Sequence, residues 1–268
     1  MRGGEGTAMF DTITIATDGR GVTRLTLNRP EKHNTLSAQM IAELTRVAGQ
    51  LGADPAVRVV VLAAKGDSFC AGGDLEWMRA QIAGDAAARR AGATGLAMML
   101  HALDTLPKPL IGRIHGPAFG GGVGIMSVCD LSIGSSGARF GLTETRLGLI
   151  PATIGPYVIA RIGVTAARRH MLASRLFCAE EALRIGLLST LCEPEELDEA
   201  VEAEAAAFLA CAPGAVADAK ALIRRLSPPI DQALIDATVG LLVARWESAE
   251  SAEGIAAFFE RRKPEWAQ

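Results

Sequence analysis

Aromatic residues and closely paired cysteines are scarce in this sequence of 268 residues. Aromatics make up only 4% of the chain, and no two cysteines stand at C-x-x-C spacing. The cysteines are odd in number, namely Cys70, Cys129, Cys178, Cys192 and Cys211. An odd set without redox or metal-ligand spacing is typical of reduced thiols. We therefore expect free cysteines and a cytoplasmic location.

Segments that would direct the chain to a membrane are also missing. Glycine, proline or charged residues interrupt each apolar stretch well before the roughly 18 residues that a span needs. The N-terminal decapeptide, MRGGEGTAMF, has one arginine and no apolar h-region, so it does not resemble a secretory signal. The net charge of −3 creates no general attraction for nucleic acid or anionic lipid. We expect neither a membrane nor a nucleic acid as partner.

Several catalytic and cofactor motifs are absent as well. No G-x-x-x-x-G-K-[ST] occurs, and the glycines at 120–122 do not form G-x-G-x-x-G. Residues 66–70 (GDSFC) begin like the nucleophile elbow of a serine hydrolase but lack its closing glycine. The scattered histidines show no metal-ligand spacing. The sequence thus argues against a P-loop, a dinucleotide fold, a serine hydrolase and a metal site.

The residues that are present predict an α/β protein with a sizeable core. Apolar residues make up 49% and charged residues 21%, which fits one large domain or a domain with a helical appendage. Residues 13–17 and 22–28 alternate around a glycine-containing turn and predict a β-hairpin. Ser37 precedes apolar residues at helical spacing, which predicts a capped helix over 38–51. The valine-rich run 57–63 predicts a buried strand.

The same plan is repeated further along the chain. Strands are predicted at 110–114 and 131–134, a long helix at about 86–106, and glycine-containing loops at 64–73 and 116–122. This arrangement predicts repeated β-β-α units rather than a single β-α-β fingerprint. From residue 151 the chain becomes mostly helical, with short helices at 156–162, 165–173 and 179–184, and a last strand within 187–192. We divide it into a core over 1–194, which holds the predicted site, and a C-terminal helical region over 195–268.

Two loops have the composition of an anion-stabilising site. Residues 69–75 (FCAGGDL) and 115–124 (HGPAFGGGVG) each follow a strand and open a helix. A helix start exposes free N–H groups at the positive end of the helix dipole, and small residues allow close approach of a ligand. Two such starts that face each other would direct two donors at one oxygen, as in an oxyanion hole. Tight turns alone would also explain either loop.

Together with residues 27–30 (LNRP), 140–144 (FGLTE) and 258–264 (FFERRKP), these loops resemble the enoyl-CoA hydratase/isomerase (crotonase) family. The resemblance runs from about residue 13 to the C-terminus. It implies a crotonase-like spiral of β-β-α units with a C-terminal helical trimerisation region, a homotrimer or a hexamer built as a dimer of trimers, and an acyl-CoA thioester substrate. No cofactor is implied, because coenzyme A is part of the substrate.

The resemblance also implies roles for individual residues. The two oxyanion donors fall on the N–H groups of Ala71 and Gly121, and the catalytic carboxylate falls on Glu144. Asp74 is expected to hold its loop. The residues implied in contacts with the thioester or CoA are Arg29, Ala71, Gly72, Gly73, Asp74, Leu75, Gly120, Gly121 and Lys263.

One position departs from the family pattern and leaves the reaction open. Hydratases of this family commonly carry a second glutamate where this chain has Gly124. The chain is then a hydratase that uses Glu144 alone, a Δ3,Δ2-enoyl-CoA isomerase, or a catalytically silent acyl-CoA binder. Residues 144–157 are similar to hydratases of branched, carboxylated substrates of the methylglutaconyl-CoA type, which favours the hydratase. Arg146 would then bind the substrate carboxylate or make a structural salt bridge.

Overall fold

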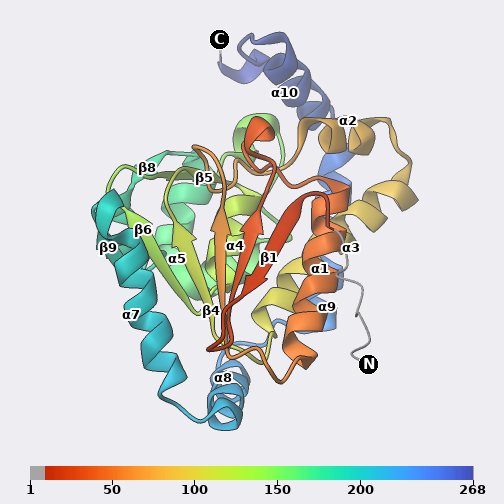
Figure 1. Cartoon of the computed structure of the whole chain (residues 1–268). Helices are drawn as coiled ribbons and strands as arrows, with labels where there is room; N and C mark the ends of the chain where they lie inside the picture. Colours follow the sequence, from red (N-terminus) through yellow and green to blue (C-terminus); the bar gives the residue numbers. More distant parts are fainter. Residues whose placement is uncertain (1–9, 268) are drawn as a thin grey trace.

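The computed structural model describes residues 10–267 of the chain. Its largest feature is a six-stranded sheet (Figure 1). Strands β1 and β2 form the predicted antiparallel hairpin, and the following strands are parallel in the order β1-β2-β3-β4-β6-β9. The bounds are β1 Ile13–Thr17, β2 Val22–Leu27, β3 Val59–Ala64, β4 Leu110–Ile114, β6 Leu131–Ser135 and β9 Thr190–Cys192. The expectation of no signal sequence and the extreme ends of the two predicted regions lie outside the described residues.

The central strands are apolar on both faces because both faces are covered. Side chains alternate across a strand, so the valines of β3 divide between two clusters. Val59 and Val61 pack against helix α7 (Leu197–Leu209), whereas Val60 and Leu62 join the main core on the opposite face. The continuous apolar run of the sequence therefore follows from burial on both sides.

A second, smaller sheet confirms the predicted β-β-α repeat. It contains β5 (Ala118–Phe119), β7 (Arg139–Gly141) and β8 (Phe177–Cys178), and an isolated bridge joins Cys70 to Ala118. Each repeat crosses the large sheet with one strand and the small sheet with the next, then returns through helical structure. These short strands escaped the sequence analysis because two or three residues are too few to show a period.

The helices of the core lie close to their predicted positions. Ser37 caps the first of them, accepting a hydrogen bond from Met40 N at 3.2 Å. The two short helices expected over 156–173 are present but joined, with Gly163 in a non-helical conformation at the junction. Their bounds are α1 Ala38–Ala53, α2 Leu75–Ala83, α3 Ala86–Asp104, α4 Gly121–Val128, α5 Gly155–Ala173 and α6 Ala179–Arg184, with 3-10 turns η1 Pro30–Lys32 and η2 Glu144–Leu147.

The C-terminal helices are in contact with the core at several places. Helix α7 covers one face of the large sheet, α9 packs against α3, and α10 lies beside α2 (Figure 1). Within residues 10–267 no single helix has the length and hydropathy to cross a bilayer; only the pair 194–209 and 213–226, bent by 103°, meets that test. The remaining bounds are η3 Pro194–Glu196, α8 Pro213–Leu226, α9 Gln232–Trp246, α10 Ala249–Glu260 and η4 Glu265–Ala267.

Candidate active site

The two glycine-containing loops lie against each other through their main chains. Phe69 N donates to Pro117 O and Phe119 N donates to Cys70 O, each at 3.0 Å. Gly122 is so close to the first loop that a Cβ atom there would overlap the Cys70 carbonyl group, and it would lie 3.0 Å from Cys70 Cβ. The small residues of the two loops therefore allow the backbone of one loop to contact the backbone of the other. This contact brings the starts of α2 and α4 to one place.

The first loop offers a free donor at Gly73 and not at Ala71. Ala71 N already donates to His33 O at 3.0 Å. Leu36 N donates to Gly72 O at 2.8 Å and Asp74 N to Leu36 O at 3.2 Å, which makes a parallel bridge between Leu36 and Gly73. In such a bridge the N–H of the bridged residue points away from its partner. Gly73 N–H has no acceptor among the described residues, so the free donor of this loop lies at Gly73 and not at Ala71, where it was predicted.

The second loop presents a free donor at Gly121. Gly121 is the first residue of α4, and residues 10–267 provide no acceptor for its N–H group. Gly120 N, in contrast, donates to Gly141 O at 2.9 Å, which ties the loop to β7. The free N–H groups at the start of α4 lie at the positive end of its dipole. Gly121 N–H is thus free to act as a donor, and its role as the second oxyanion donor stays a prediction.

Glu144 lies at the meeting point of the two loops. A Cβ atom at Gly120 would be 3.1 Å from Glu144 Oε1, and one at Gly72 would be 3.9 Å from Gly120 Cα. Glu144 Oε2 is buried and has no hydrogen-bond partner in the part of the chain described. Burial, which disfavours the charged form, raises the pKa of Glu144 to about 7. A carboxyl group with this pKa can both accept and donate a proton near neutral pH.

Asp74 and Arg29 hold the first loop in place. Asp74 Oδ1 accepts from Glu76 N at 2.9 Å and from Trp77 N at 3.2 Å, which caps α2. Its Oδ2 pairs with Arg29 Nη1 at 3.0 Å and accepts from Thr35 Oγ1 at 3.1 Å. Burial alone would raise the pKa of Asp74, but these hydrogen bonds outweigh it and lower that pKa. Both side chains are therefore engaged in structure around the loop.

A cavity of about 880 Å³ opens from the two loops toward the C-terminal helices. Its walls include every predicted site residue except Arg29 and Lys263, whose contacts with CoA stay predictions. Arg146 lines the cavity, and its side chain makes no hydrogen bond or ion pair among residues 10–267. Trp77 and Trp246 meet edge to face in the wall, with ring centroids 6.3 Å apart. The cavity thus joins a polar end at the loops to an apolar end between α2 and α9.

Gly124 has no room for the second carboxylate. A Cβ atom there would lie 2.9 Å from Ile154 Cβ and 3.8 Å from Leu100 Cδ1. Ile154 lines the cavity in its place, while Gly124 does not. The departure noted in the sequence is therefore matched by the packing around it. The sequence analysis did not single out Ile154, because its contact with α4 depends on how the chain folds back.

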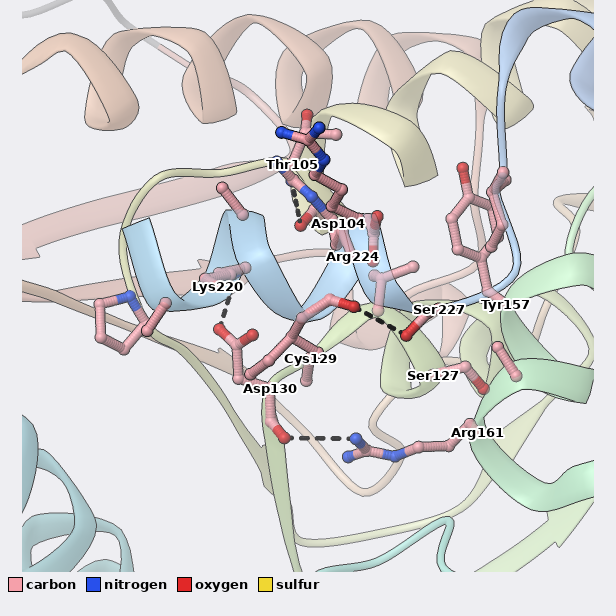
Figure 2. A pocket seen from close by; sticks show the side chains of 18 of the residues that line it. Asp104, Thr105, Ser127, Cys129, Asp130, Tyr157, Arg161, Lys220, Arg224 and Ser227 are labelled. Atoms are coloured by element: carbon pink, nitrogen blue, oxygen red, sulfur yellow. Dashed lines mark hydrogen bonds and ion pairs between the residues drawn. The ribbon is translucent and has the colours of Figure 1, made fainter. Parts of the chain in front are cut away.

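A second cavity, of about 830 Å³, lies under α8 and contains none of the predicted site residues. Three of its cationic side chains donate to acceptors of this chain (Figure 2), although Arg161 Nε and Nη2 have no partner among residues 10–267. Lys220 Nζ pairs with Asp130 Oδ2 at 2.7 Å, Arg161 Nη1 donates to the Asp130 carbonyl at 3.2 Å, and Arg224 Nη1 donates to the Asp104 carbonyl at 3.1 Å. Because it contains both free main-chain donors and a carboxyl group of raised pKa, the cavity beside Glu144 is the candidate active site.

Comparison with known proteins gives consistent matches over nearly the whole chain. The family model described as enoyl-CoA hydratase/isomerase matches residues 17–268. The (E)-benzylidenesuccinyl-CoA hydratase of Thauera aromatica is 34% identical over 91% of this chain and 94% of its own length. The short-chain-enoyl-CoA hydratase of Clostridium acetobutylicum is 32% identical over 96% of this chain and 97% of its own. The crystal structure of an enoyl-CoA hydratase from Shewanella pealeana has a TM-score of 0.79 at 36% identity, covering 96% of each chain.

Proposed function

Because this chain belongs to the enoyl-CoA hydratase/isomerase family, we propose that it is an enoyl-CoA hydratase that adds water across the 2,3 double bond of a 2-enoyl-CoA. The observation that carries this proposal is the convergence of two free main-chain donors, at Gly73 and Gly121, on a cavity that also contains the half-buried Glu144. Hydrogen-bond donors that already point to the atom where negative charge develops make the largest contribution to the rate enhancement of many enzymes.

The proposed mechanism uses Glu144 twice. As a carboxylate, it takes a proton from water while the water oxygen forms a bond to C3 of the substrate. The π electrons of the double bond move toward the thioester, whose oxygen becomes an enolate held by Gly73 N–H and Gly121 N–H. Glu144 then gives its proton to C2, which yields the 3-hydroxyacyl-CoA and restores the carboxylate. A single carboxylate suffices because it releases the proton that it has taken up.

A Δ3,Δ2-enoyl-CoA isomerase is the second candidate. The packing of Ile154 against Gly124 favours it, since the site then offers one carboxylate to move a proton between C4 and C2. The same donors would hold the same enolate. A third candidate, a silent acyl-CoA binder, fits less well with a buried carboxylate of raised pKa, because burying a charge without a role costs stability.

For the acyl group we propose a carboxylated, methylglutaconyl-like chain. Arg146 supports this choice, because it lines the cavity and no side chain of residues 10–267 pairs with it. A guanidinium group can bind a carboxylate through two parallel hydrogen bonds. The relative from Thauera aromatica also bears the name of a hydratase of a carboxylated CoA thioester. The trimer or hexamer, the cytoplasmic location and the CoA contacts of Arg29 and Lys263 stay predictions.

Turnover of purified protein tests the reaction. We expect crotonyl-CoA and methylglutaconyl-CoA to lose the ultraviolet absorbance of the conjugated thioester. Glu144→Gln should lower this rate by about 100- to 10,000-fold, the contribution of a general acid–base group, while affinity for CoA in calorimetry stays within a few fold. A gain of absorbance from a 3-enoyl-CoA alone would identify an isomerase. No change with any enoyl-CoA would reject catalysis.

A pair of substrates tests the role of Arg146. Arg146→Ala should lower kcat/KM for methylglutaconyl-CoA by about 10- to 100-fold, as expected for one charge-assisted hydrogen-bonded contact, and leave crotonyl-CoA unaffected. Arg146→Lys keeps the charge but cannot form the two parallel hydrogen bonds. Its kcat/KM for methylglutaconyl-CoA should therefore lie between those of the wild type and Arg146→Ala. Equal losses with both substrates would mean that Arg146 does not recognise the carboxylate.

A further inference from the structure

The turn that carries Glu144 is held from outside by the junction of α9 and α10. Arg245, near the end of α9, donates from Nε to the Gly148 carbonyl oxygen at 3.0 Å, and its Nη2 donates to the same oxygen. Nη2 also pairs with Glu250 of α10 at 2.7 Å. Gly148 closes the 3-10 turn that Glu144 opens. Arg245 therefore fixes the end of the turn opposite the carboxylate.

Main-chain packing brings α10 against the same turn. Gly148 has a φ of 68°, and a Cβ atom on it would lie 2.7 Å from Ser251 N. Gly254, one helical turn further along α10, is so close that its Cβ would lie 2.7 Å from Leu147 O. Neither position has room for a side chain. The helix and the turn thus meet backbone to backbone.

The same helix also contributes to the wall of the cavity. Phe258 of α10 lines the cavity, and the ring of Phe259 lies under the guanidinium of Arg79 from α2, 4.3 Å from the ring centroid. Figure 1 shows α10 above the ends of the strands and beside α2. A movement of α10 would therefore displace both the Glu144 turn and part of the cavity wall.

We propose that Arg245 is a positioning residue for Glu144, and that α10 clasps Gly148 and Leu147 so that the carboxylate stays at the oxyanion site. Arg245 acts through the turn and is not part of the cavity wall within residues 10–267. The turn is tight, because Leu149 N donates to Glu144 O at 3.0 Å, so a shift at Gly148 reaches the Glu144 backbone. This inference rests on the proposed function, since it concerns the group that moves the proton.

The clasp has a second consequence for the buried carboxylate. Charged or titratable side chains occur on every element around the turn. They are Arg146 on the turn itself, Asp236 and Arg245 on α9, Glu250, Glu253 and Glu260 on α10, and Arg161, Arg168, Arg169 and His170 on α5. Burial nevertheless raises the pKa of Glu144, opposed only by its own backbone. Loosening the clasp would admit water and should lower this pKa from about 7 toward its ordinary value of 4.5.

Two variants of the full chain test the proposal. Arg245→Ala removes the hydrogen bonds to Gly148, and Gly254→Ala pushes α10 away from Leu147 although alanine favours helix. With crotonyl-CoA, each should lower kcat by about 10- to 100-fold, as expected for a misplaced catalytic group, with little change in KM. The pKa of Glu144, from the pH dependence of kcat and from carbon-13 NMR of its carboxyl group, should move toward 4.5. Arg245→Lys should recover part of kcat.

Matched controls separate the possible outcomes. Glu250→Gln removes the ion pair but keeps the hydrogen bonds to Gly148, and Arg20→Ala removes an exposed ion pair elsewhere, so both should retain full kcat. Unchanged kcat and unchanged Glu144 pKa in both test variants would overturn the clasp, whatever happens to the melting temperature. A wild-type protein without turnover would reject the proposed function, whereas the NMR shift would still report on the clasp.

Discussion

The loops that carry Gly73 and Gly121 are joined by hydrogen bonds between main-chain atoms, whereas the turn that carries Glu144 is held by side chains and a helix from the far end of the chain. The two loops belong to the repeated β-β-α units, where the ends of neighbouring strands meet. The turn depends on Arg245 and on α10, and Arg245 lies 97 positions after Gly148 in the sequence. The loops are thus held within the repeated units. The turn is held in part by α5, through Thr145 and the Met171 carbonyl, and in part by the C-terminal helices.

The largest expected effect comes from breaking the contact between the loops. Gly122→Ala places a Cβ atom against the Cys70 carbonyl, so the loops must separate and at least one donor loses its position. We expect kcat to fall by about 100- to 1000-fold, the cost of one oxyanion donor. Steady-state kinetics with crotonyl-CoA measures this, and circular dichroism shows how much of the variant is folded.

A glycine in open surroundings serves as the control for that variant. Gly49 lies in α1 with no atom within 4 Å of an added Cβ. Gly49→Ala should leave kcat unchanged and raise stability by up to about 1 kcal/mol, since alanine favours helix. If Gly122→Ala behaved like Gly49→Ala, the backbone contact between the loops would not position the donors.

The next effect concerns the stability cost of burying Glu144. The folded-state pKa, about 7, lies above the ordinary value of 4.5, so stability falls as pH rises between these values and the full cost applies above the folded pKa. The shift corresponds to roughly 3 kcal/mol. Glu144→Gln should therefore unfold at higher denaturant concentration than the wild type at pH 8, although it is inactive. Equal stability of the two proteins at every pH would mean that the ionised Glu144 side chain does not destabilise the folded protein.

Much of the local region was predictable from sequence, and the remote one was not. The hairpin, the Ser37 cap and the position of α4 follow from patterns within ten or fifteen residues. The choice of donor did not, because the acceptor that occupies Ala71 N–H is His33 O, which belongs to a turn far from the loop in sequence. The contact of Arg245 with Gly148 likewise leaves no mark in either segment. Long-range hydrogen bonds depend on the assembled fold, which a sequence pattern does not specify.

A smaller effect is expected where the first loop meets α2. Asp74→Ala removes the cap of α2 and leaves Arg29, whose side chain is only 17% exposed, without its partner. Loss of a cap and of a shielded ion pair should cost about 2 kcal/mol. Because the pKa of Asp74 is held below its ordinary value, this stabilisation is complete above about pH 4 and is lost in more acid solution. Urea unfolding of both proteins at pH 7 and pH 3 checks this, and an equal difference at the two pH values would contradict it.

The smallest effect gives the sharpest comparison, because one chemical change is made in each region. Ser37 caps α1 and Ser248 caps α10, with Oγ accepting from Met40 N and from Ser251 N, each at 3.2 Å. Replacing either serine with alanine should cost about 1 kcal/mol of unfolding free energy. Only Ser248→Ala loosens the helix that clasps the Glu144 turn, so only it should lower kcat, by about threefold to tenfold if most of that free energy acts on the catalytic geometry. If the two variants have equal melting temperatures but only Ser248→Ala has a lower kcat, the position of the carboxylate depends on α10 and that of the donors does not depend on α1. If the two variants have equal kcat, the carboxylate depends on α10 no more than the donors depend on α1.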